Sequence, residues 1–144
     1  MSVEENVAVV RRHLDTLASG DIDASVACYS PDTLNHGRHA PPEAMHRVLS
    51  SLYTLHERHT IEEIIATDDK VVVRTMCHGL HAGTPEFPPL NGGILHGVPP
   101  THKEYTVQHI HIFGVRDGKI VGHWANRDDL GMAQQLGFTI TPPQ

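Results

Sequence analysis

Hydrophobic side chains repeat at helical spacing up to about residue 55 of this 144-residue chain, and at strand spacing from about residue 59. Residues three or four apart share one face of a helix, whereas residues two apart share one face of a strand. Helices that come first and are followed by a run of antiparallel strands are the α+β pattern. The change of period therefore predicts an α+β fold in which helices cover an antiparallel sheet.

Three helices are expected in the first part of the chain. Ser2 and Glu5 form a capping box ahead of the first one, and Gly20 ends it. A short helix should cover residues 21–29, and a third should begin at Pro41, because proline suits a first helical turn. The side chains expected on the buried faces of the first and third helices are Val3, Val7, Val10, Leu14, Leu17, Met45, Val48, Leu49, Leu52 and Leu55.

The later part of the chain alternates with a period of two between turn-forming residues. The segment over residues 83–100 contains five prolines and four glycines, with Phe87 and Leu90 among its few apolar residues. It is too long for a simple hairpin, and we expect it to cover a pocket. Extended segments are expected over residues 33–36, 60–67, 71–80, 104–115 and 120–127, followed by a helical turn over residues 130–136.

Composition excludes several classes of function. The net charge of −6 and the scattered basic residues argue against a nucleic-acid partner, because phosphate binding needs clustered lysine and arginine. No stretch is long and apolar enough for a membrane helix, and the N-terminus does not resemble a signal peptide. Cys28 and Cys77 lack metal-type spacing and make no disulfide framework. We expect one domain over residues 1–144 of a reduced, cytoplasmic protein.

The most unusual feature of the composition is its 13 histidines. His123 follows the Asp-Gly hairpin that ends the strand of His109 and His111, so the three imidazoles are expected to converge on one patch of sheet. An alternative is that Ile110 and Ile112 face the core, which would leave the histidines merely polar in solvent. We favour the pocket, because three histidines recur on one face of two neighbouring strands. That face of the first strand carries Val107, His109, His111 and Phe113.

Three kinds of function follow from such a pocket. A histidine with a pKa near neutrality is suited to moving protons, which indicates a cofactor-independent enzyme. His109, His111 and His123 could instead bind a metal ion with an open fourth position, as in a hydrolase or lyase. A third alternative is a non-catalytic module that binds a small molecule. Open imidazoles with shifted pKa values would favour an enzyme, and fully bonded ones would favour binding alone.

Several motifs resemble those of the SnoaL-like polyketide (ester) cyclases. They run in the family's order from about residue 5 to residue 137, which is nearly the whole chain. The C-terminal ones are Asp117-Gly118-Lys119-Ile120, His123-Trp124, Asp128 with Leu130-Gly131, and Gln135-Leu136-Gly137. The earlier ones are Pro31-Asp32-x-Leu34-Asn35, Gly79-Leu80-His81-Ala82-Gly83 and Val98-Pro99-Pro100-Thr101.

The resemblance implies the cone-shaped nuclear transport factor 2-like fold, in which three N-terminal helices wrap a curved antiparallel sheet around a pocket. It implies a small-molecule substrate, a homodimer or higher homo-oligomer built through the sheet, and no cofactor. The family's reaction is an intramolecular aldol closure, in which a side-chain base removes a proton alpha to a carbonyl. Here Ala125 occupies the position of the family's acid/base aspartate, so a histidine base would have to replace that carboxylate.

Carried over residue by residue, the resemblance assigns pocket positions to Asn35, His111 and His123. His109 stands where the cyclases have a pocket glutamine. The expected function is that of a cyclase, an isomerase or a hydratase-type lyase that acts on a mainly apolar, oxygenated molecule such as a polyketide or terpenoid. We expect His109 or His111 to act as the base, His123 to be its partner or a proton donor, and Asn35 to donate a hydrogen bond to a substrate carbonyl. The full set of expected catalytic residues is His109, His111, His123 and Asp128. The expected substrate contacts are Asn35, His81, Phe113 and Trp124.

Some of these assignments have alternatives in the sequence. Strand parity points Asp128 away from the histidines, unless a bulge turns it inward. His81 has a structural alternative, a hydrogen bond at a strand end, and Trp124 could lie in the core or at an interface. Arg127 and Asp129 are expected to form a salt bridge at the surface or between subunits. The histidines expected at the surface are His13, His56, His59, His96 and His102.

Overall fold

In the computed structural model, which describes residues 2–86 and 93–144, the helices are α1 (Val3–Ser19), α2 (Ile22–Val26), α3 (Pro42–Tyr53) and α4 (Asp129–Gln135). The strands are β1 (Tyr29–Asn35), β2 (Arg38–His39), β3 (Arg58–Ala66), β4 (Lys70–Leu80), β5 (Glu104–Arg116) and β6 (Lys119–Arg127). The capping box and the left-handed glycine at the end of α1 are present as predicted. The α+β fold predicted from the period change is confirmed.

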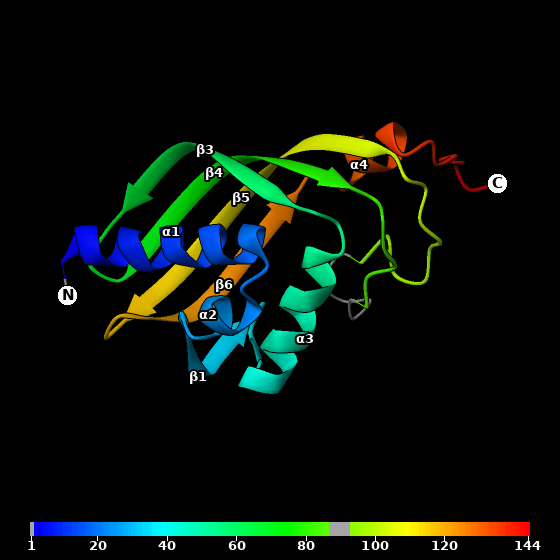
Figure 1. Cartoon of the computed structure of the whole chain (residues 1–144). Helices are drawn as coiled ribbons and strands as arrows, with labels where there is room; N and C mark the ends of the chain where they lie inside the picture. Colours follow the sequence, from blue (N-terminus) through cyan, green and yellow to red (C-terminus); the bar gives the residue numbers. More distant parts are fainter. Residues whose placement is uncertain (1, 87–92) are drawn as a thin grey trace.

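The six strands form one curved sheet in the order β2-β1-β6-β5-β4-β3 (Figure 1). Neighbouring strands are antiparallel except β1 and β6, which pair in parallel. The sheet is therefore mixed, whereas the sequence predicted antiparallel strands throughout. A parallel pair needs a long connection between its strands, and the helix α3 and four strands supply it here. The parallel pairing sets Asn35 beside His123.

Helices α1, α2 and α3 lie on one side of this sheet (Figure 1). Val73 and Phe113 are fully buried on the sheet face that they cover, and Val10 of α1 and Leu49 of α3 pack there. The opposite face is more open, since Ile110 is 42% exposed and Val107 on the covered face is 3% exposed. The alternative in which the isoleucines face the core is therefore wrong. A second cluster packs beneath α4 and contains Leu55, Cys77, Leu95, Tyr105, Val107, Met132 and Leu136.

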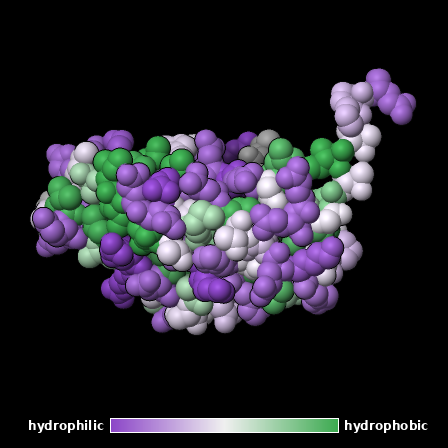
Figure 2. Space-filling view, turned by 90° about the horizontal axis from the view of Figure 1, so that it is seen from above, coloured by the Kyte–Doolittle hydropathy of each residue, from purple (hydrophilic) through white to green (hydrophobic). Residues whose placement is uncertain are grey.

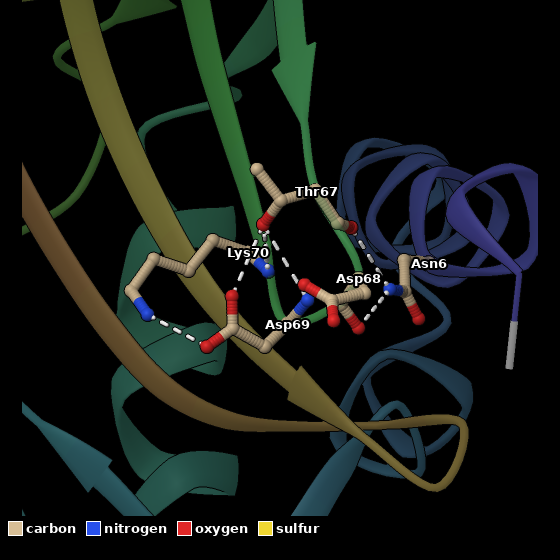
Figure 3. Close-up of polar contacts among 5 residues, drawn as sticks. All are labelled: Asn6, Thr67, Asp68, Asp69 and Lys70. Atoms are coloured by element: carbon tan, nitrogen blue, oxygen red, sulfur yellow. Dashed lines mark hydrogen bonds and ion pairs between the residues drawn. The ribbon is translucent and has the colours of Figure 1, made fainter.

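A buried asparagine attaches α1 to the turn between β3 and β4. Asn6 Nδ2 donates to the carbonyl oxygens of Thr67 and Asp68, at 3.3 and 2.9 Å (Figure 3). Inside the turn, the Thr67 hydroxyl donates to Asp69, and Lys70 Nζ donates to the other oxygen of that carboxylate. Because the turn carbonyls are satisfied by a helix side chain, α1 is held across the sheet at this end.

Two further segments bear on expectations from the sequence. Phe87 and Leu90, in the segment expected to cover a pocket, lie outside the described residues, while Leu95 from the same segment is buried beneath α4. Residues 139–144 are exposed, and the C-terminal tail extends away from the body of the molecule (Figure 2). Within the described residues, no helix combines the length and apolar character that crossing a membrane requires.

Candidate active site

A cavity that is partly open to solvent lies between the helices and the covered face of the sheet. Its apolar wall comes from α1 and α3, whose side chains there are Leu14, Leu17, Met45, Val48, Leu49 and Leu52. Its polar wall comes mainly from the sheet and includes Asn35, His36, Glu57, His59, His109, His111, His123 and Arg127, with His13 and Tyr29 also lining the cavity. One wall therefore suits an apolar ring system, and the other presents imidazoles to it.

Four predicted site residues line this cavity, namely Asn35, His109, His111 and His123. Alternation along β5 points His109 and His111 inward, and the Asp-Gly hairpin sets the register of β6. His123 pairs with Phe113 rather than with His111, so the two imidazoles meet diagonally across the two strands. The predicted convergence of the three histidines is present in the structure.

The other four predicted residues do not line the cavity. Trp124 is 42% exposed on the opposite face, and Phe113 is buried beneath the imidazoles, with its ring centroid 4.9 Å from that of His123. His81 is buried just after β4, where Nδ1 accepts from the backbone N–H of Thr101. Asp128 caps α4 by accepting from the N–H of Gly131, at 2.8 Å. No bulge turns Asp128 inward, because its carboxylate is engaged by the helix.

Asn35, His123 and His111 form a directed hydrogen-bond chain. The carboxamide oxygen of Asn35 accepts from Nδ1 of His123, at 3.0 Å. With its proton on Nδ1, a neutral His123 has a lone pair on Nε2, which accepts from Nδ1 of His111 at 2.9 Å. His111 is then left with a lone pair on Nε2, and this buried nitrogen has no partner among the described residues. The chain thus ends in an unpaired basic nitrogen.

Burial keeps these imidazoles uncharged. It lowers the pKa of His123 to about 3 and that of His111 well below its usual value, and neighbouring imidazoles add to the effect. Burial likewise lowers the pKa of His109 to about 3, with His59 and Arg127 contributing. At neutral pH all three rings are therefore neutral, and the unpaired Nε2 of His111 keeps its lone pair available to a ligand.

The prediction of a surface position is wrong for two histidines. His13 is 4% exposed and has both ring nitrogens bonded, Nδ1 to Ser25 at 2.8 Å and Nε2 to the Tyr29 hydroxyl at 3.0 Å. The hydroxyl of Ser25 donates to a backbone carbonyl, so it accepts from His13, and Tyr29 must be the donor to Nε2. His13 shares its helix face with Val10 and Leu17, a signal that could have identified it.

His59 is the second mispredicted histidine. It lines the cavity from β3, with Nδ1 2.9 Å from the hydroxyl of Thr75. Alternation with Ile61 along the strand was an available signal, although a bulge just after Ile61 shifts the later register. His56, His96 and His102 are exposed as predicted.

A buried carboxyl group in the cavity was not predicted. Glu57 is 9% exposed and accepts from the Tyr105 hydroxyl at 2.8 Å, and burial raises its pKa. It follows the end of α3, outside any periodic pattern, so the sequence carries no signal for its position. Nε of Arg127 lies 3.7 Å from Oδ1 of Asp129, so the predicted salt bridge is present. Arg127 also lines the cavity, which was not predicted.

The described residues bring together a possible metal-binding set that differs from the predicted one. His111 and His123 bond to each other, whereas ligand atoms of His59, Cys77 and His109 all lie within 4.8 Å of one another. Spacing along the chain does not reveal partners on three neighbouring strands, so this set could not be predicted from the sequence. Cys28 and Cys77 are both free thiols, as expected.

Comparisons with known proteins agree with this architecture. Residues 7–136 match the family described as SnoaL-like polyketide cyclase. A curated relative, nogalonic acid methyl ester cyclase of Streptomyces nogalater, is 29% identical over 111 residues, or 75% of each chain. TsrD of Streptomyces laurentii is 23% identical, with a TM-score of 0.77 over 96% of this chain and 99% of that one. IdmH of Streptomyces antibioticus is 26% identical, with a TM-score of 0.70 over 91% and 97%.

Proposed function

This chain belongs to the SnoaL-like polyketide cyclase family, and from that premise we propose that it closes a ring in an oxygenated, mainly apolar polyketide by histidine acid/base chemistry. The family supports a cofactor-independent cyclase. The observation that carries the more specific proposal is the hydrogen-bond chain from Asn35 through His123 to His111, which ends in an unpartnered basic nitrogen at the cavity.

In the proposed reaction, Nε2 of His111 is the base. It removes a proton from the carbon alpha to a carbonyl, and the resulting enolate attacks a second carbonyl carbon of the same molecule. A C–C bond forms, and the new alkoxide takes back the proton from His111. The base is thereby regenerated without any co-reactant, as an intramolecular aldol closure requires.

The neighbouring residues have supporting roles in this proposal. The hydrogen bonds to His123 and Asn35 fix the tautomer of His111. They also stabilise its protonated form, because the hydrogen bonds along the chain strengthen one another when His111 becomes positively charged. The amide nitrogen of Asn35 is the donor that we assign to a substrate carbonyl. Between the two candidate bases, His111 is preferred to His109, since only His111 is oriented by a chain of partners among the described residues.

The relative's name suggests the first substrate to assay. That relative is named for the cyclisation of a methyl ester, and the apolar wall formed by α1 and α3 suits a mainly apolar ester. We therefore propose an ester of a polyketide acid as the substrate class.

The experiment measures turnover of nogalonic acid methyl ester by the purified chain and by His111→Ala, His111→Gln and His123→Ala. Loss of a general base lowers kcat by about 10² to 10⁴. His96→Ala, which changes an exposed imidazole, is the control and should keep the wild-type rate. Circular dichroism spectra would establish that each variant folds. Folded His111 and His123 variants that both turn over at the wild-type rate would refute the assignment.

We also propose that the chain forms a homodimer through the open face of its sheet. Ile110 and Ile112 on β5 and Trp124 on β6 are all at least 37% exposed on that face. Apolar side chains grouped on a sheet face are typical of an interface. Sedimentation velocity should give a dimer for the wild type and a monomer for Trp124→Glu; a wild-type monomer would contradict the proposal.

A further inference from the structure

We propose that His59, Cys77 and His109 bind a zinc ion, or another divalent transition metal that favours nitrogen and sulfur ligands, in the wall of the cavity. Each residue offers one ligand atom, and the three atoms all lie within 4.8 Å of one another. Two imidazoles and a thiolate are a ligand set that zinc accepts with tetrahedral geometry. This inference does not depend on the proposed function.

The sheet itself assembles the three ligands. His59 on β3 is the direct cross-strand partner of Cys77 on β4, and His109 on β5 is the partner of Thr75. Thr75 and Cys77 are two residues apart on one strand, so their side chains share the covered face. Three adjacent strands therefore each direct one ligand to the same place, on regular and well-packed secondary structure.

The hydrogen bonds around the set suit metal binding. Nδ1 of His59 is 2.9 Å from the Thr75 hydroxyl, which leaves Nε2 of that ring for a metal ion. Such an outer-shell bond is the usual means of orienting a histidine ligand. His109 is 4% exposed, and its Nδ1 is buried without a partner among the described residues. An unsatisfied buried nitrogen destabilises the fold, and a metal ion bound by this ring would compensate.

Cys77 must lose its proton to coordinate the ion. Its side chain is fully buried near Glu57, whose carboxyl group lies in the cavity wall, and burial followed by the charge of Glu57 raises the pKa of the thiol. The thiol proton passes to Glu57 or to water as the metal–sulfur bond forms, so one proton leaves Cys77 for each ion bound. The neutral imidazoles coordinate without losing a proton.

A tetrahedral ion held by three side chains keeps a fourth position open. His59 and His109 both line the cavity, so the open position would face a bound small molecule. An ion there would polarise a carbonyl oxygen of that molecule. His111 and His123 remain outside the set, because the grouped ligand atoms belong only to His59, Cys77 and His109, and Nδ1 of His111 and Nε2 of His123 bond to each other.

The test is a titration of the chelator-treated, full-length protein with Co²⁺, followed by absorption spectroscopy. We expect saturation at one ion per chain, with visible bands of tetrahedral cobalt and a near-ultraviolet band of thiolate-to-cobalt charge transfer. Cys77→Ser and Cys77→Ala should abolish the charge-transfer band. His59→Ala and His109→Ala should weaken binding by at least about tenfold. Zn²⁺ should displace the cobalt from the wild type.

Cys28→Ser is the matched control, since Cys28 is the other buried free cysteine and lies outside the set. It should keep both bands. Absence of a charge-transfer band in the folded wild type would overturn the proposal, and so would a band that survives Cys77→Ala or that disappears in Cys28→Ser. Turnover by metal-free protein tests the proposed function separately. His111→Ala should bind cobalt normally while losing turnover, which distinguishes the two ideas.

Discussion

Nδ1 of His111 lies 2.9 Å from Nε2 of His123, and a neutral imidazole pair at this distance must share one proton between a donor and an acceptor. The direction is set at the far end of the chain, where the oxygen of Asn35 can only accept. Asn35 is therefore the residue that decides which nitrogen of His111 is basic. It does so from β1, through the parallel pairing with β6.

Asn35→Ala should therefore lower activity while leaving the proposed base, His111, in place. The tautomer of His123 is no longer fixed. In part of the population His111 therefore carries its proton on Nε2, where the lone pair of the base is needed. We expect kcat to fall by roughly tenfold or more, but less than the 10² to 10⁴ expected for loss of the base, with a smaller change in KM. Kinetics with nogalonic acid methyl ester would measure both parameters.

Nitrogen-15 spectra of the histidine rings provide an independent readout of the same change. In the wild type, His123 should show a protonated Nδ1 and an unprotonated Nε2, and Asn35→Ala should give a mixture of tautomers. Asn126→Ala, which changes an exposed asparagine on β6, is the control. A single, unchanged tautomer in Asn35→Ala would contradict the argument.

Strand alternation was sufficient to predict which side chains of β5 and β6 face the cavity. His109, His111 and His123 were identified because a strand has a strict period of two and the Asp-Gly turn restricts the register. The chain of partners could not be predicted in the same way. It depends on Asn35, which reaches His123 through a pairing between strands far apart in the sequence.

The burial of His13 and Glu57 was not predicted, and each case has a physical reason. His13 was read as a polar surface residue, although its helix face is apolar, because sequence alone does not reveal that Ser25 and Tyr29 satisfy both its nitrogens. Glu57 has no periodic signal, and its burial depends on tertiary contacts such as the one with Tyr105, which lies far away in the sequence on β5. Such polar contacts arise from tertiary packing and are not encoded locally.

Burial of His13 predicts a loss of stability in acid. Burial, with a contribution from His59, lowers its pKa from 6.5 to about 3, so the unfolded chain binds a proton in the intervening pH range that the folded chain does not. The stabilisation is fully present above pH 6.5 and is lost as the pH falls towards 3. This group alone contributes a slope of up to about 1.4 kcal/mol per pH unit.

Urea unfolding between neutral and mildly acidic pH would measure this effect. His13→Gln should be less stable than the wild type at neutral pH, because its hydrogen bonds to Ser25 and Tyr29 are disturbed. Its free energy of unfolding should also depend less steeply on pH. His96→Gln changes an exposed ring and is the comparison variant. Equal slopes for His13→Gln and the wild type would show that His13 does not cause the acid sensitivity.

Gly79→Ala should destabilise the fold by overpacking. A Cβ atom at Gly79 would overlap the ring and hydroxyl of Tyr105, whose hydroxyl donates to the buried Glu57. The ring must move, at a cost of about 1–3 kcal/mol in the free energy of unfolding. Gly114→Ala is the matched control, because its nearest neighbouring atom would be 3.6 Å from the new Cβ. Similar losses in the two variants, measured by urea unfolding, would contradict the steric explanation.

Ala125→Leu should block substrate binding while leaving the histidines in place. Ala125 lines the cavity and is the cross-strand partner of His111, so a larger side chain would occupy the space beside the proposed base. We expect KM for nogalonic acid methyl ester to rise at least about tenfold. The steric clash should weaken substrate binding by more than ~1.4 kcal/mol, the free energy that corresponds to a tenfold change. Asn126→Leu, one residue further and on the open face, should leave KM unchanged. Because neither substitution removes a titratable group, an unchanged KM in folded Ala125→Leu would place the substrate elsewhere, even if the histidine variants were inactive.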